Sequence, residues 1–177
     1  MPRIQIDVNP VSHITADAIG SPGKRVFYIQ AWNKDQPKPF TVILEKIQLQ
    51  AIIINVENFI INLERSKPNL VPATASYDQE KMPITPPVNP LFRIGEFKLG
   101  YDEKTDLLIF AVYEIQTEDS SVEEASVLQL WCSRSQVRNM AHWSQEVISR
   151  GRPICPQCNQ PIEPEGHFCP KKNGHKH

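Results

Sequence analysis

The stretch Phe40-Thr41-Val42-Ile43-Leu44-Glu45-Lys46-Ile47-Gln48-Leu49 changes its hydrophobic pattern half-way along. Phe40, Val42 and Leu44 stand at every second position, which is typical of a half-buried β-strand. Beyond them, apolar residues recur at steps of three and four: Leu49, Ile52, Ile53, Val56, Phe59, Ile60 and Leu63. That spacing is the apolar stripe of a helix, and its length outweighs the β-branched content. The stretch therefore predicts a strand over residues 40–45 that runs directly into a helix over residues 46–65.

A second copy of this pattern lies 88 residues further along the chain. The series Phe40-x-Val42-x-Leu44-x-Lys46-x-Gln48-Leu49 matches Leu128-x-Leu130-x-Cys132-x-Arg134-x-Gln136-Val137 at that constant offset. Residues 133–136 also have the Ser-x-x-Gln form of a capping box, which marks a helix start. Two explanations stay open at this point. The pattern is either an internal duplication of a β-β-α unit or a feature that any strand-to-helix junction shows.

The other strand patterns complete two hairpins. Residues 26–32 are rich in aromatic and β-branched residues and precede the strand at 40–45, while residues 91–101 and 107–116 flank a polar turn. Another strand pattern, at residues 127–132, leads into the second helix. We predict an α+β fold in which an antiparallel sheet carries two helices on one face. Its other face is either covered by the N-terminal segment and a loop, or used for binding.

A proline-rich stretch separates the two halves. Residues 67–90 contain six prolines and few apolar residues, so they cannot sustain a helix or a central strand. They predict an irregular loop over the surface. We expect an α+β domain over residues 1–150 and a small zinc-binding module over residues 151–177.

Composition and charge argue against several classes of protein. The formal net charge of -1 gives no global reason to expect binding to nucleic acid or to an anionic membrane. No stretch approaches the roughly 18 apolar residues of a membrane span. The first residues lack the basic start and apolar run of a signal peptide, so we expect a cytoplasmic, reducing location with free thiols. Cys132 lies in an apolar strand pattern and is predicted to be a small buried residue.

The strongest chemical signal is a cluster of cysteines and histidines near the C-terminus. Cys155-Pro156-Gln157-Cys158 can place two sulfurs on one tetrahedral ion, because the residues between them fold into a tight turn. Cys169 supplies a third thiolate, and either His167 or His175 can supply the fourth ligand. Four protein ligands leave no open position for a catalytic water, so the pattern predicts a structural zinc ion.

Four segments of the chain form a recognisable set: Arg25-Val26-Phe27-Tyr28-Ile29-Gln30-Ala31, Leu44-Glu45-Lys46-x-Gln48, Arg93-Ile94-Gly95 and the zinc-ribbon-like tail at residues 152–174. In these segments the chain resembles a family of bacterial proteins that is defined only as a domain of unknown function. Members often end in an aromatic residue where this chain has His175. The resemblance therefore implies Cys155, Cys158, His167 and Cys169 as the ligands. No established activity comes with the family.

Three functions are compatible with these features. The leading hypothesis is a non-enzymatic binding or adaptor module with a structural zinc ion, whose partner is a protein or a small molecule. The first alternative is an enzyme or nucleotide-processing factor, which requires Glu45, Lys46, Arg134 and Gln136 to converge on one deep pocket.

The second alternative is nucleic-acid binding through the basic C-terminal part. Residues 125–177 hold seven Lys and Arg against three Asp and Glu, and Arg134 lies one helical turn from Arg138. A solvated helix face near a zinc module is the simpler explanation of this excess. No catalytic residue is assigned, because the familiar phosphate loops, nucleophile elbows and metalloprotease motifs do not occur.

Overall fold

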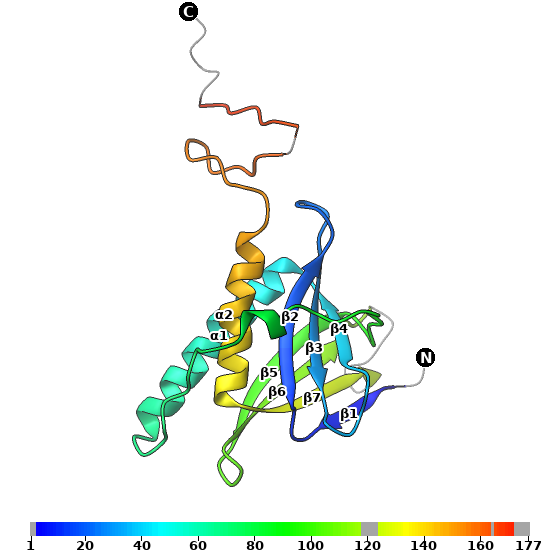
Figure 1. The fold of residues 1–177 in the computed structure, drawn as a ribbon, viewed down its shortest axis with the longest axis vertical. Coiled ribbons are helices and arrows are strands. Elements are labelled where there is room, and N and C mark those ends of the chain that lie inside the picture. The colour runs from blue at the N-terminus through cyan, green and yellow to red at the C-terminus, as the bar shows by residue number, and fades with distance from the viewer. Residues whose placement is uncertain (1–2, 118–123, 164, 172–177) are drawn as a thin grey trace, which may run out of the picture.

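The fold of this chain, in a computed structural model, is α+β, as the sequence predicts (Figure 1). The structure describes residues 3–117, 124–163 and 165–171. In chain order the strands are β1 (Gln5–Val8), β2 (His13–Ile19), β3 (Val26–Trp32), β4 (Phe40–Leu44), β5 (Ile94–Asp102), β6 (Leu107–Glu114) and β7 (Val127–Ser133). Helix α1 (Lys46–Ser66) follows β4, and helix α2 (Arg134–Ser149) follows β7. A short 3₁₀ turn, η1 (Gln79–Lys81), interrupts the proline-rich loop.

The strands form two sheets where a single sheet was expected. One is antiparallel, in the order β2-β3-β4, and the other has the order β1-β7-β6-β5, with β1 parallel to β7. The N-terminal strands β1 and β2, which the sequence did not reveal, each extend one sheet. Pro10 lies between them and cannot donate a ladder hydrogen bond, so the chain leaves the first sheet there and enters the second.

The two sheets remain connected on both sides. At one junction the Ile43 N–H donates to the Phe92 carbonyl at 3.0 Å. At the other, the Val11 N–H donates to Trp131 O and the Ser12 N–H to Trp32 O, both at 2.8 Å. These bonds satisfy main-chain groups that would otherwise be unpaired at the sheet edges.

The repeated pattern of the sequence corresponds to a repeated unit of three strands and a helix: β2-β3-β4-α1 and β5-β6-β7-α2. Gln48 Oε1 accepts from the Glu45 N–H, and its Nε2 donates to Ile94 O at 2.9 Å. Gln136 Oε1 likewise accepts from the Ser133 N–H, and its Nε2 donates to Val11 O at 3.1 Å. Each glutamine thus caps its own helix and holds the start of the first strand of the other unit. This equivalence supports the duplication and adds a strand to the predicted unit.

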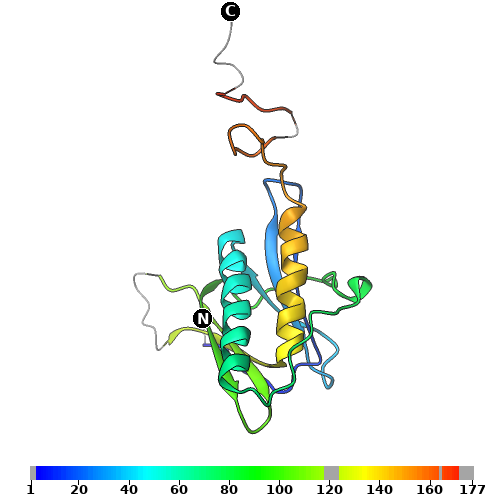
Figure 2. The same ribbon diagram turned by 90° about the vertical axis from the view of Figure 1, so that its left-hand side faces the viewer.

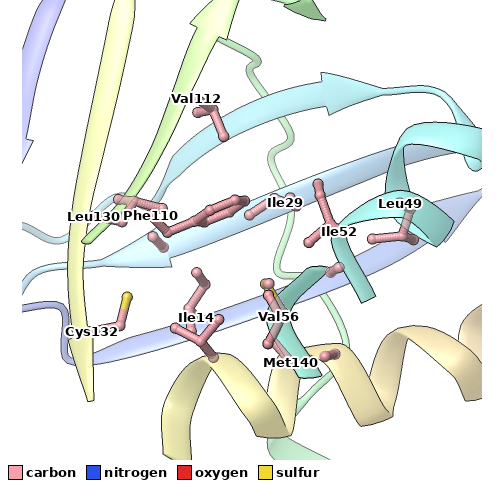
Figure 3. Close-up of a cluster of buried hydrophobic side chains, with 14 of the residues drawn as sticks. Ile14, Ile29, Leu49, Ile52, Val56, Phe110, Val112, Leu130, Cys132 and Met140 are labelled. Carbon is pink, nitrogen blue, oxygen red and sulfur yellow. The ribbon is translucent and has the colours of Figure 1, made fainter. Parts of the chain in front are cut away.

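The helices lie side by side and enclose the core with the two sheets (Figure 2). They are antiparallel, since Glu57 on α1 pairs with Arg138 and Glu64 pairs with Arg134. Apolar side chains from the helices and from both sheets meet in the core, as Figure 3 shows. They include Ile14, Ile29, Leu49, Ile52, Val56, Phe110, Val112, Leu130, Cys132 and Met140. Cys132 is fully buried, as predicted. Burial of such side chains supplies the main stabilisation of the fold.

The proline-rich loop covers the outer face of the β2-β3-β4 sheet. Thr15, Gln30 and Thr41 lie opposite one another across the three strands and are buried. The Gln30 side chain donates to Thr85 O at 3.2 Å and accepts from Thr85 N at 2.9 Å. The Thr15 hydroxyl donates to Met82 O. The sequence left open whether the outer face is covered or used for binding. On the β2-β3-β4 sheet, the proline-rich loop covers it.

Candidate metal centre

The C-terminal segment folds back on itself after α2. An isolated bridge pairs Ile154 with Pro161, and the Cys155 N–H donates to Gln160 O at 2.9 Å. The Asn159 N–H returns to Cys155 O at 2.9 Å, which closes a tight turn around Cys155 and Cys158. Asn159 has a φ of 58°, a conformation that asparagine tolerates better than most residues. We call residues 153–170 the metal knuckle.

Four side chains of the metal knuckle point toward a common centre. The ligand atoms of Cys155, Cys158, His167 and Cys169 all lie within 4.8 Å of one another. Cys155 Sγ is 3.8 Å from Cys169 Sγ, and Cys158 Sγ is 3.1 Å from His167 Nε2. A tetrahedral ion bound to sulfur at about 2.3 Å needs sulfurs separated by about 3.8 Å. The four residues are therefore positioned to hold a metal ion.

The electrostatics of the turn prepare one thiol for coordination. The backbone N–H groups of Cys158 and Gln157 donate toward Cys155 Sγ and lower the pKa of that thiol to about 6. Burial instead raises the pKa of Cys158. Cys132 differs from both, because complete burial in β7 raises its pKa. Since the thiolate is the form that binds metal, Cys155 is suited to be the first ligand.

A family model described as a protein of unknown function, DUF3090, matches residues 7–169. The chain belongs to the DUF3090 family. The matched span includes all four candidate ligands and ends at Cys169. The competing ligand His175 lies beyond that span and outside the described residues. Neither the curated proteins nor the solved structures provide a match. Among the helices of the DUF3090 chain that the structure describes, none has the length and apolar character to cross a membrane.

The four residues of the enzyme hypothesis do not meet in the DUF3090 chain. Glu45 and Lys46 lie at the start of α1, while Arg134 and Gln136 lie at the start of α2. Because the helices are antiparallel, these two starts are at opposite ends of the helix pair. Glu45 pairs with Arg93 instead. The expectation of one pocket holding all four side chains is therefore wrong.

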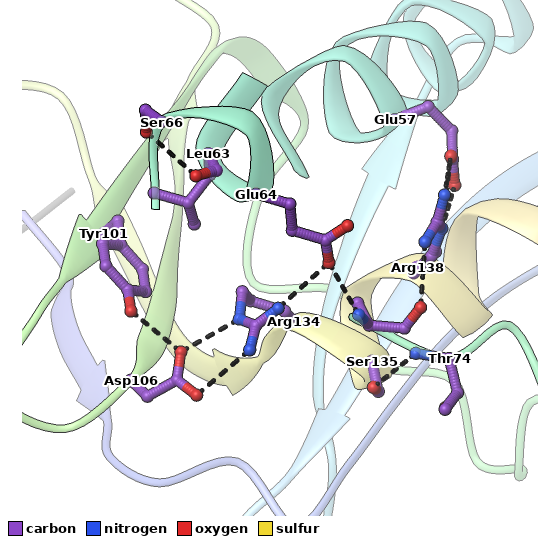
Figure 4. A network of polar contacts seen from close by, with 11 residues as sticks. Glu57, Leu63, Glu64, Ser66, Thr74, Tyr101, Asp106, Arg134, Ser135 and Arg138 are labelled. Atoms are coloured by element: carbon purple, nitrogen blue, oxygen red, sulfur yellow. Dashed lines mark hydrogen bonds and ion pairs between the residues drawn. The ribbon is translucent and has the colours of Figure 1, made fainter. Parts of the chain in front are cut away.

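Arg134 is part of a network between elements, shown in Figure 4. Its Nε lies 2.9 Å from Asp106 Oδ1, its Nη2 lies 3.2 Å from Asp106 Oδ2, and its Nη1 lies 3.1 Å from Glu64 Oε1. Hydrogen bonding to Arg134 lowers the pKa of Asp106, and the same contact raises the pKa of the guanidinium. Tyr101 donates a further hydrogen bond to Asp106. The network joins both helices to the β5-β6 hairpin.

A second ion pair lies one turn along the same helices. Arg138 donates to both carboxylate oxygens of Glu57 and, through Nη1, to Ala73 O at 2.9 Å. His142 Nε2 lies 3.0 Å from the same carboxylate. Arg134 and Arg138 are therefore occupied by carboxylates of α1, which removes one of the reasons for considering nucleic acid. Sequence reasoning missed these partners, because no local pattern pairs residues so far apart in the chain.

Proposed function

We propose that Cys155, Cys158, His167 and Cys169 bind a zinc ion with a structural role. The observation that supports this proposal is that three sulfurs and one imidazole nitrogen lie within 4.8 Å of one another, with Cys155 Sγ 3.8 Å from Cys169 Sγ. Thiolates select zinc, copper(I) or iron–sulfur clusters over magnesium or calcium. A mononuclear site of three sulfurs and one nitrogen is the familiar arrangement of structural zinc.

The composition of the metal knuckle supports a structural role. Two of its large apolar side chains are turned outward, since Ile154 is 56% exposed and Phe168 is 75% exposed, and Ile162 is only half-buried. Of the residues that the structure describes in this segment, only Cys155 and Cys169 are buried. Such a segment cannot build an apolar core of its own, whereas zinc supplies about 10–16 kcal/mol of apparent binding free energy to small zinc folds. Zinc would therefore provide most of the free energy that orders this segment.

The whole chain is best assigned as a cytoplasmic, non-enzymatic binding or adaptor protein of the zinc-ribbon type. A four-ligand site leaves no coordination position for a substrate or a catalytic water. The separation of Glu45 and Lys46 from Arg134 and Gln136 also favours this assignment over an enzyme. A reducing compartment would keep the thiols available for zinc.

Metal analysis of the purified full-length chain tests the zinc site. We expect one zinc per chain, loss of zinc in Cys155→Ser, and weaker retention in His167→Ala. Cys132→Ala is the matched control, because this cysteine lies in the core and should leave the zinc content unchanged. Full retention of zinc in His167→Ala would assign the fourth position to His175 or to water. Absence of stoichiometric zinc from the wild type would refute the proposal.

A further inference from the structure

A cavity of about 180 Å³ lies between the α+β part and the metal knuckle. Three cationic side chains, Arg25, Lys46 and Arg152, line it together with one carboxylate, Glu45. The metal knuckle supplies part of the wall through Ile154 and Pro161. We propose that this cavity binds a phosphoryl group and that metal binding, which orders its wall, controls access to it. The second half of this inference rests on the proposed zinc site.

The charge of the cavity is not balanced by the protein. Glu45 is paired with Arg93, and Arg152 is paired with Glu163. Arg25 and Lys46 make no ion pair with any carboxylate in the part of the chain that the structure describes. Arg25 and Lys46 therefore lack a carboxylate within ion-pair distance, and only the more distant Asp17 acts on the charge of Arg25. A ligand that carries a double negative charge would balance these two cations.

Arg25 is held in place before any ligand arrives. Its Nη1 donates to Val147 O at 2.6 Å, and its Nη2 donates to Ile148 O at 3.3 Å, both near the end of α2. Its guanidinium also lies 5.0 Å from the centre of the Phe27 ring. Partial burial lowers the pKa of this group, and the charge of Asp17 acts in the opposite direction. A guanidinium that is already held in one position is a suitable anchor for an oxyanion, because little side-chain entropy remains to be lost.

The internal repeat provides a comparison within the same molecule. Lys46 and Arg134 occupy equivalent positions as the first residue of α1 and α2, and neither helix has an acidic residue in its first turn. A cation at a helix start is electrostatically unfavourable. In the second unit Asp106 and Glu64 offset it. In the first unit the carboxylate at the helix start is the N-cap residue Glu45, which is paired with Arg93, so Lys46 has no ion-pair partner of its own in the described part of the chain and faces the cavity.

Size and chemistry together select the ligand class. At about 30 Å³ per water, the cavity holds about six waters, while sites that enclose a whole organic ligand start at about 300 Å³. It therefore accommodates a phosphoryl group and leaves the remainder of the molecule outside. A carboxylate would neutralise only one of the two free charges. Arginine and lysine are the usual phosphate-binding residues.

Calorimetry on the zinc-loaded, full-length protein with inorganic phosphate tests the inference. Lys46 is exposed, so Lys46→Ala should keep the fold, and we expect phosphate affinity to fall by about tenfold or more. Lys104→Ala removes an exposed cation in a turn and should leave the affinity unchanged. Arg25→Lys keeps the charge but loses the two-pronged geometry, and it should also weaken binding. Equal affinity in wild type and Lys46→Ala would overturn the site.

Parallel titrations identify the source of the phosphoryl group and the contribution of zinc. Lys46-dependent binding of phosphate but not of short oligo-dT supports a small phosphorylated ligand, whereas Lys46-dependent binding of oligo-dT supports a phosphodiester of nucleic acid. Acetate binding as tightly as phosphate would contradict selection of a dianion. Zinc-loaded protein without Lys46-dependent phosphate binding refutes this inference and leaves the zinc site intact. A protein that never holds zinc but still binds phosphate through Lys46 would refute the zinc proposal and the control of the cavity by metal binding. The proposed phosphate site would stand.

Discussion

The pairing of Arg134 with Asp106 makes the sharpest prediction for the stability of the fold. Arg134 is only 6% exposed, and two of its nitrogens contact the Asp106 carboxylate. Replacing Asp106 with Asn removes the negative charge and keeps the size of the side chain. Asp106 has a φ of 53°, which Asn also tolerates, so the substitution adds little backbone strain. Asp106→Asn therefore isolates the electrostatic contribution.

The expected loss is about 1.5–3 kcal/mol in the free energy of unfolding at pH 7. A hydrogen bond to a charged group contributes about 1.5–3 kcal/mol net. Two such bonds connect the pair, but the Asp106 side chain is 50% exposed, so solvent screens the interaction and the total should not exceed the value for one strong bond. The side-chain oxygen of Asn can also still accept a hydrogen bond from Arg134, which limits the loss. Removing Asp106 leaves a buried guanidinium with Glu64 as its remaining carboxylate, which is why the loss exceeds that of an ordinary surface ion pair.

Urea unfolding of wild type and Asp106→Asn across pH provides the assay. The pKa of Asp106 is lowered in the folded state by its hydrogen bond with Arg134. The carboxylate therefore contributes stability above its unfolded pKa of about 3.9, and that contribution disappears as the pH falls through the lower folded pKa. The difference between the two proteins should be constant from pH 6 to 8 and shrink at strongly acidic pH. Asp35→Asn, at an exposed position, is the control. A loss below about 0.5 kcal/mol at pH 7, or a difference that persists at acidic pH, would refute the reasoning.

Two further predictions concern thiol reactivity and the proline-rich loop. In metal-free protein near pH 7, iodoacetamide should modify Cys155 far faster than Cys132, because Cys132 is buried in the core and burial raises its pKa, while the segment around Cys155 lacks the zinc that would order it. Mass spectrometry that finds the reverse order would contradict this prediction. Gln30→Ala should cost about 1–3 kcal/mol in the free energy of unfolding, because it removes two hydrogen bonds of about 0.5–1.5 kcal/mol each to the main chain of Thr85, which is exposed. Hydrogen exchange at Thr85 should accelerate in that variant but not in exposed Gln50→Ala, and unchanged protection would show that Gln30 does not hold the loop.

Much of the architecture was predictable because its determinants are local. A capping glutamine and its N-cap residue are three positions apart, so the starts of α1 and α2 can be recognised from short stretches around Gln48 and Gln136. The same holds for the metal knuckle, where Cys155 and Cys158 share one tight turn. The irregular loop at residues 67–90 follows directly from its prolines.

The two N-terminal strands escaped prediction for a physical reason. Strand β1 is short and pairs in parallel with β7, more than a hundred positions away in the chain. Strand β2 contains Ala16 and Ala18, residues with weak β-propensity, and is stabilised by β3 and by contact with α2. Each of them is the edge strand of a different sheet, so each sheet has one strand that was not expected.

The sequence by itself determined the α+β class, the repeated strand-to-helix junction and a set of candidate metal ligands close together in the chain. Only the tertiary structure decided that Arg134 is occupied by Asp106 and Glu64, and that Lys46 instead faces a cavity beside Arg25. The two cations look alike in sequence, because each follows a strand and opens a helix. Their surroundings differ because electrostatic interactions depend on distance in space, and the neighbouring charges come from distant parts of the chain.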